Sequence, residues 1–237
     1  MLRKTIGIAV GTLILITSAS LHAGVYVGAG VGSDTVDFTM RARVTRPNAG
    51  FAPDFDVINK AHLSATGIFG TLFVGINRVY NNIFYLAAEI NGNLSSTAST
   101  GFNREFVNGT FSDTTIKIKN SLGISFLPGY QFTPNTLFYG RLGLTNSEFK
   151  VNTSDISLAN FSKRRNGFRY GLGIQQSITQ RLAVRMDYSR INYRSIKTDT
   201  LDPLGGVTKE NIMSANQQLI EFGVVFKFDQ PMVVATK

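Results

Sequence analysis

Residues 219–228 read LIEFGVVFKF, and this stretch decides the fold. Every second side chain in it is apolar: Ile220, Phe222, Val224, Phe226 and Phe228. The alternate row holds both charges of the stretch, Glu221 and Lys227. A period of two is typical of a β-strand, since successive side chains of a strand point to opposite faces. One apolar face opposite a charged face indicates a barrel wall with lipid outside and a polar interior.

Five earlier segments repeat this alternation. In residues 182–189, for example, Arg185 and Asp187 fall in the row opposite the apolar one. In residues 137–151 the same holds for Arg141, which lies opposite Phe138 and Leu142. Across all these segments the polar row contains the following charged side chains: Glu89, Lys117, Lys119, Arg141, Arg169, Arg185, Asp187 and Glu221.

Short polar turns alternate with long polar stretches between these segments. The turns are RVYNNI near residue 80, QFTPNT near 133 and SITQRL near 180. The long stretches are rich in Gly, Pro, Asn, Asp, Ser and Thr, which favours loops; they are Val44–Lys60, Ser95–Asp113, Asn152–Arg164 and Ser195–Met213. This division predicts eight strands, over residues 24–43, 62–79, 83–94, 114–131, 137–151, 165–178, 182–194 and 214–228.

The pattern predicts an all-β fold: an eight-stranded antiparallel up-and-down transmembrane β-barrel with short periplasmic turns and long extracellular loops. A soluble eight-stranded barrel is the alternative, but it would turn the apolar rows to water. The near-neutral mean hydropathy of +0.04 and the 16% of charged residues fit strands with one apolar and one polar face. The absence of cysteine excludes disulfides, thiolate metal sites and thiol nucleophiles.

The N-terminal 23 residues have the layout of a secretory signal peptide. Arg3 and Lys4 precede an apolar core from Ile6 to Ile16, and small or polar residues lead to Ala23. This core is too short to cross a bilayer as a helix. We expect export and cleavage, a barrel over residues 24–228 and a tail over 229–237. Removal of Arg3 and Lys4 lowers the formal net charge from +9 to +7.

The charged inner row predicts an ion-pair network in the middle of the lumen. A closed eight-stranded barrel has a narrow interior that side chains fill. An unpaired charge buried there costs on the order of several kcal/mol. Five of the charged residues fall at similar depths, counted from the short-turn end of each strand: Glu89, Arg141, Arg185, Asp187 and Glu221. Together with Arg169, Lys117 and Lys119 they would close the bore.

The segments as a set resemble the small outer-membrane β-barrel family that includes opacity-type proteins and the OmpA-like eight-stranded barrel domain. The resemblance rests on GVYVGAGVG at 24–32, FYLAAEING at 84–92, LFYGRLGL at 137–144 and LIEFGVVFKF at 219–228. It implies an integral protein of the outer membrane of a Gram-negative bacterium. It also implies that the outward row of the closing strand, Ile220 to Phe228, is recognised by the barrel-assembly machinery. In this family an aromatic residue usually ends the chain, whereas here residues 229–237 follow Phe228.

Candidate chemistry is sparse, and we expect no enzyme activity, no cofactor and no metal. Beyond the expected cleavage site the chain holds one histidine, His62, on the same strand face as Ser64. Such a pair is similar to part of a lipid A deacylase site, but a base and a nucleophile also need an orienting acid. Asp54 and Asp56 lie in a predicted loop, where solvated carboxylates are common.

The basic cluster Lys163, Arg164 and Arg165 lies at the base of the third long loop. At that height it could contact lipopolysaccharide phosphates, which basic side chains pair with well. The expected partners are therefore outer-membrane lipids and lipopolysaccharide, the assembly machinery and a host or extracellular surface ligand; nucleic acid is not expected. We expect the protein to act through its loops, in adhesion, antigenic display or envelope integrity. A small-solute porin is the alternative, and a lipid-modifying enzyme is a third.

Overall fold

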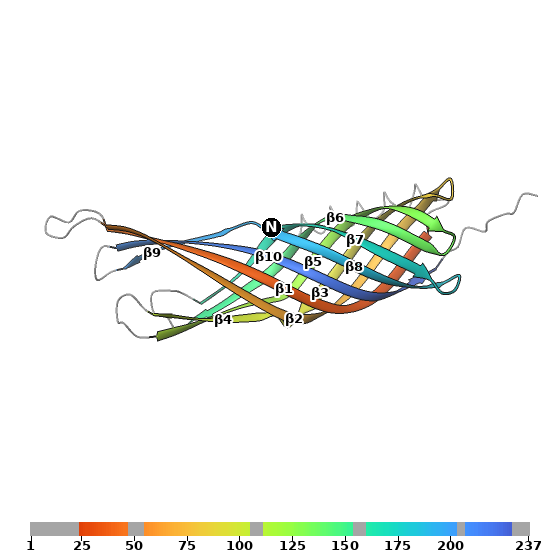
Figure 1. The fold of residues 1–237 in the computed structure, drawn as a ribbon. Coiled ribbons are helices and arrows are strands. Elements are labelled where there is room, and N and C mark those ends of the chain that lie inside the picture. The colour runs from red at the N-terminus through yellow and green to blue at the C-terminus, as the bar shows by residue number, and fades with distance from the viewer. Residues whose placement is uncertain (1–23, 47–54, 105–110, 154–159, 203–206, 229–237) are drawn as a thin grey trace, which may run out of the picture.

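A computed structural model describes residues 24–46, 55–104, 111–153, 160–202 and 207–228 of the chain. The predicted signal peptide and the predicted tail lie outside these described residues. Ten β-strands make up the described chain (Figure 1). They are β1 (Gly24–Arg46), β2 (Phe55–Tyr80), β3 (Phe84–Ser95), β4 (Ala98–Arg104), β5 (Phe111–Thr133), β6 (Thr136–Thr153), β7 (Phe161–Ser177), β8 (Leu182–Tyr193), β9 (Ile196–Asp202) and β10 (Val207–Lys227).

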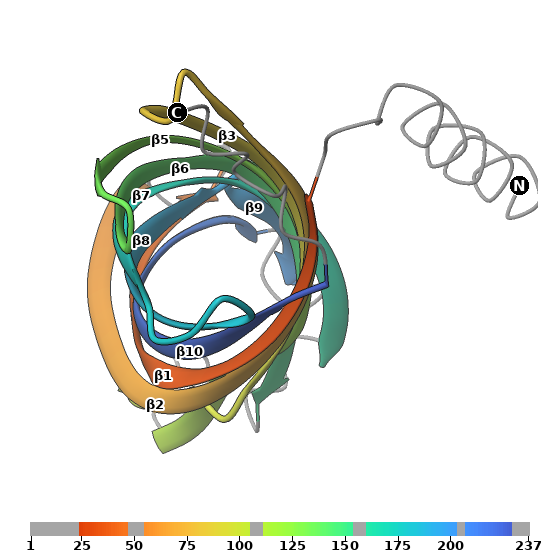
Figure 2. The ribbon, with the colours of Figure 1, turned by 90° about the vertical axis from the view of Figure 1, so that its right-hand side faces the viewer.

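The strands form a closed antiparallel ring of eight, as the sequence predicts. The ring runs β1-β2-β3-β5-β6-β7-β8-β10, and β10 pairs with β1 to close it. β4 continues the path of β3, and β9 continues the path of β8, each after a short break. The ring is visible along its axis in Figure 2. No helix among the described residues is long and apolar enough to cross a membrane.

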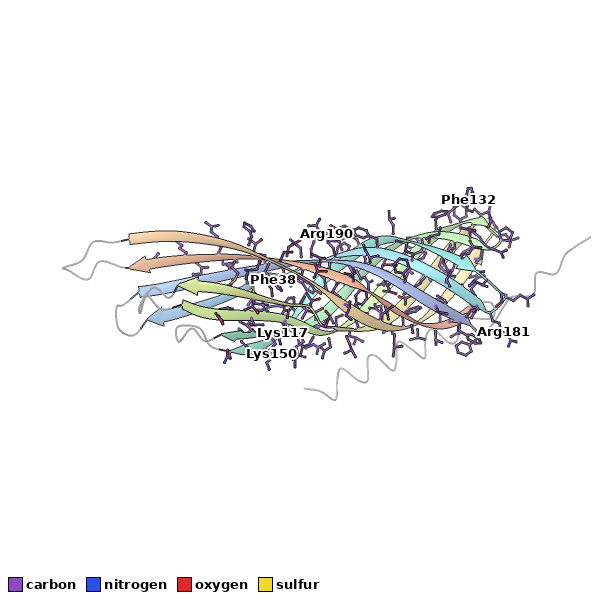
Figure 3. All side chains as sticks on the ribbon, turned by 60° about the horizontal axis from the view of Figure 1, so that its bottom comes forward. Phe38, Lys117, Phe132, Lys150, Arg181 and Arg190 are labelled. Atoms are coloured by element: carbon purple, nitrogen blue, oxygen red, sulfur yellow. The ribbon has the colours of Figure 1, made fainter. Side chains whose placement is uncertain are left out.

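The short turns gather at one end of the ring and set the pairing of the strands that they join. The turn between β2 and β3 has positive φ at Asn81 (52°) and Asn82 (56°), and Ile83 N donates to Tyr80 O at 3.0 Å. Two central residues with positive φ make the tight hairpin turn whose twist matches that of paired strands, and asparagine tolerates this conformation. Phe132 and Arg181 mark the same end in Figure 3.

An apolar belt surrounds the half of the ring nearest the short turns. Outward side chains there are exposed and apolar on every strand, for example Val31, Leu72, Leu144, Leu172 and Phe222. Above the belt the outward row becomes polar: on β1 it changes from Val31 to Ser33 and Thr35, and on β6 from Leu144 to Asn146 and Glu148. A membrane barrel needs such a belt only where lipid covers it. The strands therefore continue well beyond the lipid-facing part.

The polar stretches that the sequence predicts as long loops are for the most part strand. β1 and β2 stay paired up to Arg46 and Phe55, and β10 stays paired with β1 up to Thr208. The predicted strands were therefore too short at their loop-side ends, near residues 43, 62 and 214. Polar residues rich in threonine and asparagine lowered the apparent strand signal, although they sit in regular antiparallel ladders.

The ring divides into two four-stranded sheets above the belt. Pairing of β2 with β3 ends near Ile68 and Ser96, and pairing of β7 with β8 ends near Asn166 and Arg194. The strands on either side of these two seams continue without pairing across them: β9, β10, β1 and β2 form one sheet, and β4, β5, β6 and β7 the other. Figure 1 shows the ribbons separating at the loop end.

An apolar core fills the space between the two sheets. Phe38 of β1 and Phe149 of β6 meet edge to face, with ring centroids 6.5 Å apart, and Phe149 meets Tyr193 at 4.9 Å. The other buried members of this core are Val36, Phe69, Ile116, Ile118, Val151, Ile191, Ile196, Met213, Ala215 and Leu219. The distribution of apolar side chains is thus reversed along the axis: they lie on the outside in the part nearest the short turns and on the inside in the part beyond the belt.

Candidate functional site

Five charged side chains from four strands meet at the centre of the lumen. Arg141 of β6 donates from Nη1 to Glu89 Oε1 of β3 at 2.8 Å and from Nε to Asp187 Oδ2 of β8 at 2.9 Å. Arg185 of β8 donates from Nη1 to Glu89 Oε2 at 2.7 Å. Its Nη2 donates to Glu221 Oε1 of β10 at 2.8 Å. Glu89 and Arg185 thus join opposite parts of the ring wall across the bore.

A third guanidinium, that of Arg169 on β7, completes this cluster more loosely. Its Nη2 lies 3.7 Å from Asp187 Oδ1 and 3.7 Å from Glu221 Oε2, while its Nε donates to Ser189 Oγ at 2.9 Å. The six side chains are buried, with at most 3% of any of them exposed. Three guanidiniums balance three carboxylates, so the formal charges cancel. Buried charges of one sign alone would be strongly destabilising.

Aromatic rings pack against the network on the short-turn side. Tyr26 donates to Glu89 Oε2 at 3.2 Å, and Tyr139 donates to Asp187 Oδ2 at 3.1 Å. The Arg185 guanidinium lies over the Phe73 ring, 3.4 Å from its centroid. These rings belong to a buried cluster that also contains Tyr85, Ala87, Leu127, Leu137, Ala183 and Val225. The packing of these rings on the ion pairs was not predicted from the sequence, although Tyr139 shares the inward row with Arg141.

Inward glycines make room for these rings. A Cβ at Gly28 would overlap the Phe73 ring, one at Gly75 would overlap Tyr26, and one at Gly173 would overlap Tyr139. Glycine in a strand often marks such a close approach. We expect these positions to tolerate no larger side chain.

A second carboxylate site lies on the loop side of the network. Asp34 of β1 is fully buried and accepts hydrogen bonds from three neutral donors. They are Ser95 Oγ at 2.9 Å, Thr97 Oγ1 at 2.5 Å and Gln217 Nε2 at 2.7 Å. Sequence reasoning missed Asp34, but its position in the row of Gly28, Gly30 and Gly32 was a usable signal. The bore is therefore filled in turn by rings, ion pairs, the hydrogen-bonded polar side chains around Asp34 and the apolar core.

Lys117 and Lys119 do not join the network, and that part of the prediction was wrong. Both are exposed on the outer face of β5, while Ile116 and Ile118 are buried inside. The reason is a β-bulge: Ile118 pairs with Phe149 but Ser121 pairs with Ser147, so β5 has one extra residue there. A bulge of this kind changes which face the following side chains take. Strict alternation counted up from Ser125 therefore assigns the wrong face above Ser121.

The basic cluster at 163–165 is divided between the two faces of β7. Arg164 lies in the outward row, opposite Glu148 of β6 in the ladder, and its Nε donates to Asn146 Oδ1 at 2.5 Å. Lys163 and Arg165 lie in the other row, opposite Phe149 and Ser147. The structure therefore does not bring the three together on one surface. Arg190 lies in the outward row of β8 and is partly buried. Figure 3 shows it midway along the barrel.

The closing strand presents its apolar row to the outside. β10 lies between β1 and β8 in the ring. Its outward side chains are exposed over the whole row Ile220, Phe222, Val224, Phe226 and Phe228. Phe226 and Phe228 meet edge to face, with their centroids 5.3 Å apart.

His62 and Ser64 lie on the outer face of β2 above the belt, but they form no catalytic relay. Ser64 Oγ donates to Asp37 Oδ1 at 2.8 Å, and His62 Nδ1 lies 3.3 Å from Thr39 Oγ1. A base must receive the proton of its nucleophile and be oriented by an acid. Here the acid holds the hydroxyl directly and the histidine bonds elsewhere. Asp54 lies outside the described residues.

A family model described as "Outer membrane protein beta-barrel domain" matches residues 8–228. Among solved structures, the outer membrane protein OprG from Pseudomonas aeruginosa is 14% identical, with 87% of this chain and 97% of that chain covered and a TM-score of 0.48. Neisserial surface protein A is also 14% identical, with 87% and 99% covered and a TM-score of 0.44.

Ail, the attachment invasion locus protein of Yersinia pestis, was solved in complex with the heparin analogue sucrose octasulfate. It is 15% identical, with 84% of this chain and 99% of that chain covered and a TM-score of 0.35. At such identities the likeness concerns the fold alone. No curated protein matches the chain in sequence. The family match over most of the chain, together with the ring of eight strands and its apolar belt, shows that the protein belongs to the family of outer-membrane β-barrel proteins.

Proposed function

We propose that the protein is a plugged outer-membrane anchor that acts through the part of the barrel beyond the membrane, by adhesion to an extracellular surface ligand. One observation carries this proposal: the strands continue past the apolar belt into a polar-surfaced body with its own apolar core. Such a body is a rigid platform for the chain segments at its tip. A barrel that only spanned the membrane would need no second core.

The filled lumen supports this proposal over the porin alternative. Arg141 and Arg185 join carboxylates from β3, β8 and β10, and the phenylalanine and tyrosine rings lie directly against them. An eight-stranded barrel has room only for such side chains. We expect the purified protein to give no stable single-channel steps in planar bilayers. Regular conductance steps that persist after further purification would support the porin instead.

Adhesion can be tested by exchanging each long loop tip for a short glycine-serine linker. The four tips are residues 47–54, 105–110, 154–159 and 203–206. Binding of labelled host cells or matrix to bacteria that display the intact protein should fall when the relevant tip is exchanged. The matched control replaces Asn81-Asn82 at the opposite end by Asn-Gly, which keeps a tight hairpin turn. Unchanged binding in all four variants would reject the adhesive role.

Two further partners belong to the same proposal. The outward row of β10, from Ile220 to Phe228, would serve as the signal for the barrel-assembly machinery. Arg164 is the member of the basic cluster that lies above the belt in the outward row, so it would contact lipopolysaccharide phosphate. Arg190, in the outward row of β8 opposite Tyr170, would give a second basic contact nearer the belt. Lys163 and Arg165, which lie in the other row, would contribute less.

A further inference from the structure

The two seams above the membrane leave strand edges without a partner. Among the described strands, β9 pairs only with β10, through Met213 to Val207, and nothing pairs with its other edge. The facing strand, β7, pairs there only with β6. A free edge offers a row of main-chain N–H and C=O groups to any extended chain.

The opposite seam, between β2 and β4, is covered by side chains. The side chain of Leu63 lies 3.0 Å from where a Cβ of Gly101 would stand, and Gly67 packs against Thr97. Leu63 also packs on the apolar core between the sheets. This close contact leaves no room for an added strand, so the seam between β7 and β9 is the stronger candidate.

The base of the β7–β9 seam is basic. Lys163, Arg164 and Arg165 lie on β7, and Arg194 and Lys197 lie on the side of β9. The acidic side chains described nearby are Glu148, which is opposite Arg164, and Glu210, whose Oε1 is 4.0 Å from Lys197 Nζ. Arg165 Nε is buried and has no hydrogen-bond partner among the described atoms. Asp199 and Asp202 lie on β9 itself, two and five residues beyond Lys197, so the basic character is confined to the start of this strand and to β7.

We infer that the β7–β9 seam is a docking site for an extended acidic polypeptide segment. The segment adds to β9 as a further strand and places its carboxylates against the basic side chains at the membrane-side end of the seam. The free edge supplies main-chain hydrogen bonds, and the basic side chains supply preference for acidic sequences. Charge of this kind also speeds association and suppresses wrong partners. The inference deepens the proposed adhesive role, because it names the surface and the chemistry of a ligand.

The test uses the full-length barrel in lipid nanodiscs at physiological salt, where distant charges are screened. The probe is a short end-blocked peptide that alternates glutamate with valine, and a second probe carries N-methyl groups at alternate amides. We expect saturable binding of the first peptide and loss of binding for the second, which cannot form the ladder. Hydrogen exchange should show new protection at residues 196–202 when the first peptide is bound.

A charge-matched pair of variants separates the seam from general attraction. Arg194→Glu with Lys197→Glu should weaken peptide binding about tenfold or more. Lys117→Glu with Lys119→Glu makes the same change of net charge on the exposed face of β5 and should change binding less than about twofold. Both lysines are exposed, and Figure 3 places Lys117 on the loop side of the barrel.

Three results would overturn the inference. Absence of binding would mean that the basic residues only protect the edge from pairing. Equal binding of the N-methylated peptide would mean anion attraction without an added strand, and so would equal weakening by the two variant pairs. These outcomes leave the adhesion test untouched, because that test exchanges the loop tips and not the seam.

Discussion

Arg141 shows how one residue can link much of the barrel. Its side chain is fully buried and holds Glu89 and Asp187 on different strands with short hydrogen bonds. A buried ion pair stabilises a fold little more than a well-packed apolar pair does, but removing one partner leaves the other charge buried and unpaired. The network therefore fixes the register of facing strands, and its integrity depends on every member.

Loss of this guanidinium gives the first prediction. Arg141→Met should lower the free energy of unfolding in detergent by about 3–5 kcal/mol, because two buried carboxylates lose a partner. Urea titration followed by the gel shift of the folded barrel measures this. Arg141→Met with Asp187→Asn should lose less, since it leaves the network neutral. Lys119→Met on the exposed face is the control and should change stability by no more than about 0.5 kcal/mol.

Glu148 gives a second prediction at this scale. It lies above the belt, and the hydrogen bond that Ser162 Oγ donates to its Oε1 at 2.8 Å is the main cause that holds its pKa below the ordinary value. A lowered pKa stabilises the fold above the pKa of the unfolded chain, and this contribution disappears as pH falls through the folded pKa. Ser162→Ala should raise the pKa of Glu148 in an NMR titration. Ser195→Ala, on the other sheet, should leave it unchanged.

Strand β5 shows how one inserted residue changes which side chains of a strand face inward. Below the bulge its inward row is Ser121, Gly123 and Ser125, and above the bulge it is Ile118 and Ile116. The bulge thus lets one strand pass from a polar lumen to an apolar core. Without it, the lysines at 117 and 119 would enter the core between the sheets.

The third prediction tests this face assignment in intact cells. The chain has no cysteine, so single-cysteine variants can be labelled without background. A membrane-impermeant maleimide should label Lys117→Cys and Lys119→Cys on whole cells, because these positions are exposed and beyond the belt. Ile116→Cys and Ile118→Cys should stay unlabelled until the protein is unfolded. The reverse pattern would place the lysines inside, as strict alternation implies.

The molecule as a whole combines two folds on one set of strands. The part within the belt follows the rules of a membrane barrel, with apolar residues outward and charges inside. The part beyond it follows the rules of a soluble sandwich, with its apolar residues between two facing sheets. The surroundings of the barrel change from lipid to water along its axis, and its interior changes from polar to apolar at the same level.

The fourth prediction uses the independence of these two parts. Phe149→Ala removes the ring that meets Phe38 and Tyr193 in the core between the sheets, at a cost of about 3–5 kcal/mol for a fully buried ring. Hydrogen exchange should become faster in β4 and in the upper parts of β5, β6 and β10. The strands within the belt should keep their protection and the protein should still insert. Lys150→Ala, at the half-buried neighbouring position in the outward row, should leave exchange unchanged in both parts.

The lower part of the fold was predictable from the sequence because its signal is local. Lipid on one side and a narrow bore on the other impose a strict period of two on each strand, and residues 219–228 show it fully. The period identified Glu89, Arg141, Arg169, Arg185, Asp187 and Glu221 as inward. The upper part was not predictable in this way, because polar outward residues there look like a loop and a bulge interrupts the period.

The sequence by itself determined that eight strands form a barrel and which rows face lipid, since each follows from neighbours along one strand. Only the tertiary structure decided which charges meet, that Lys117 and Lys119 lie outside, and that the ring divides into two sheets. These features depend on the register between strands that are far apart in the chain. Register is set by ladders, bulges and packing across the bore, and no single strand contains that information.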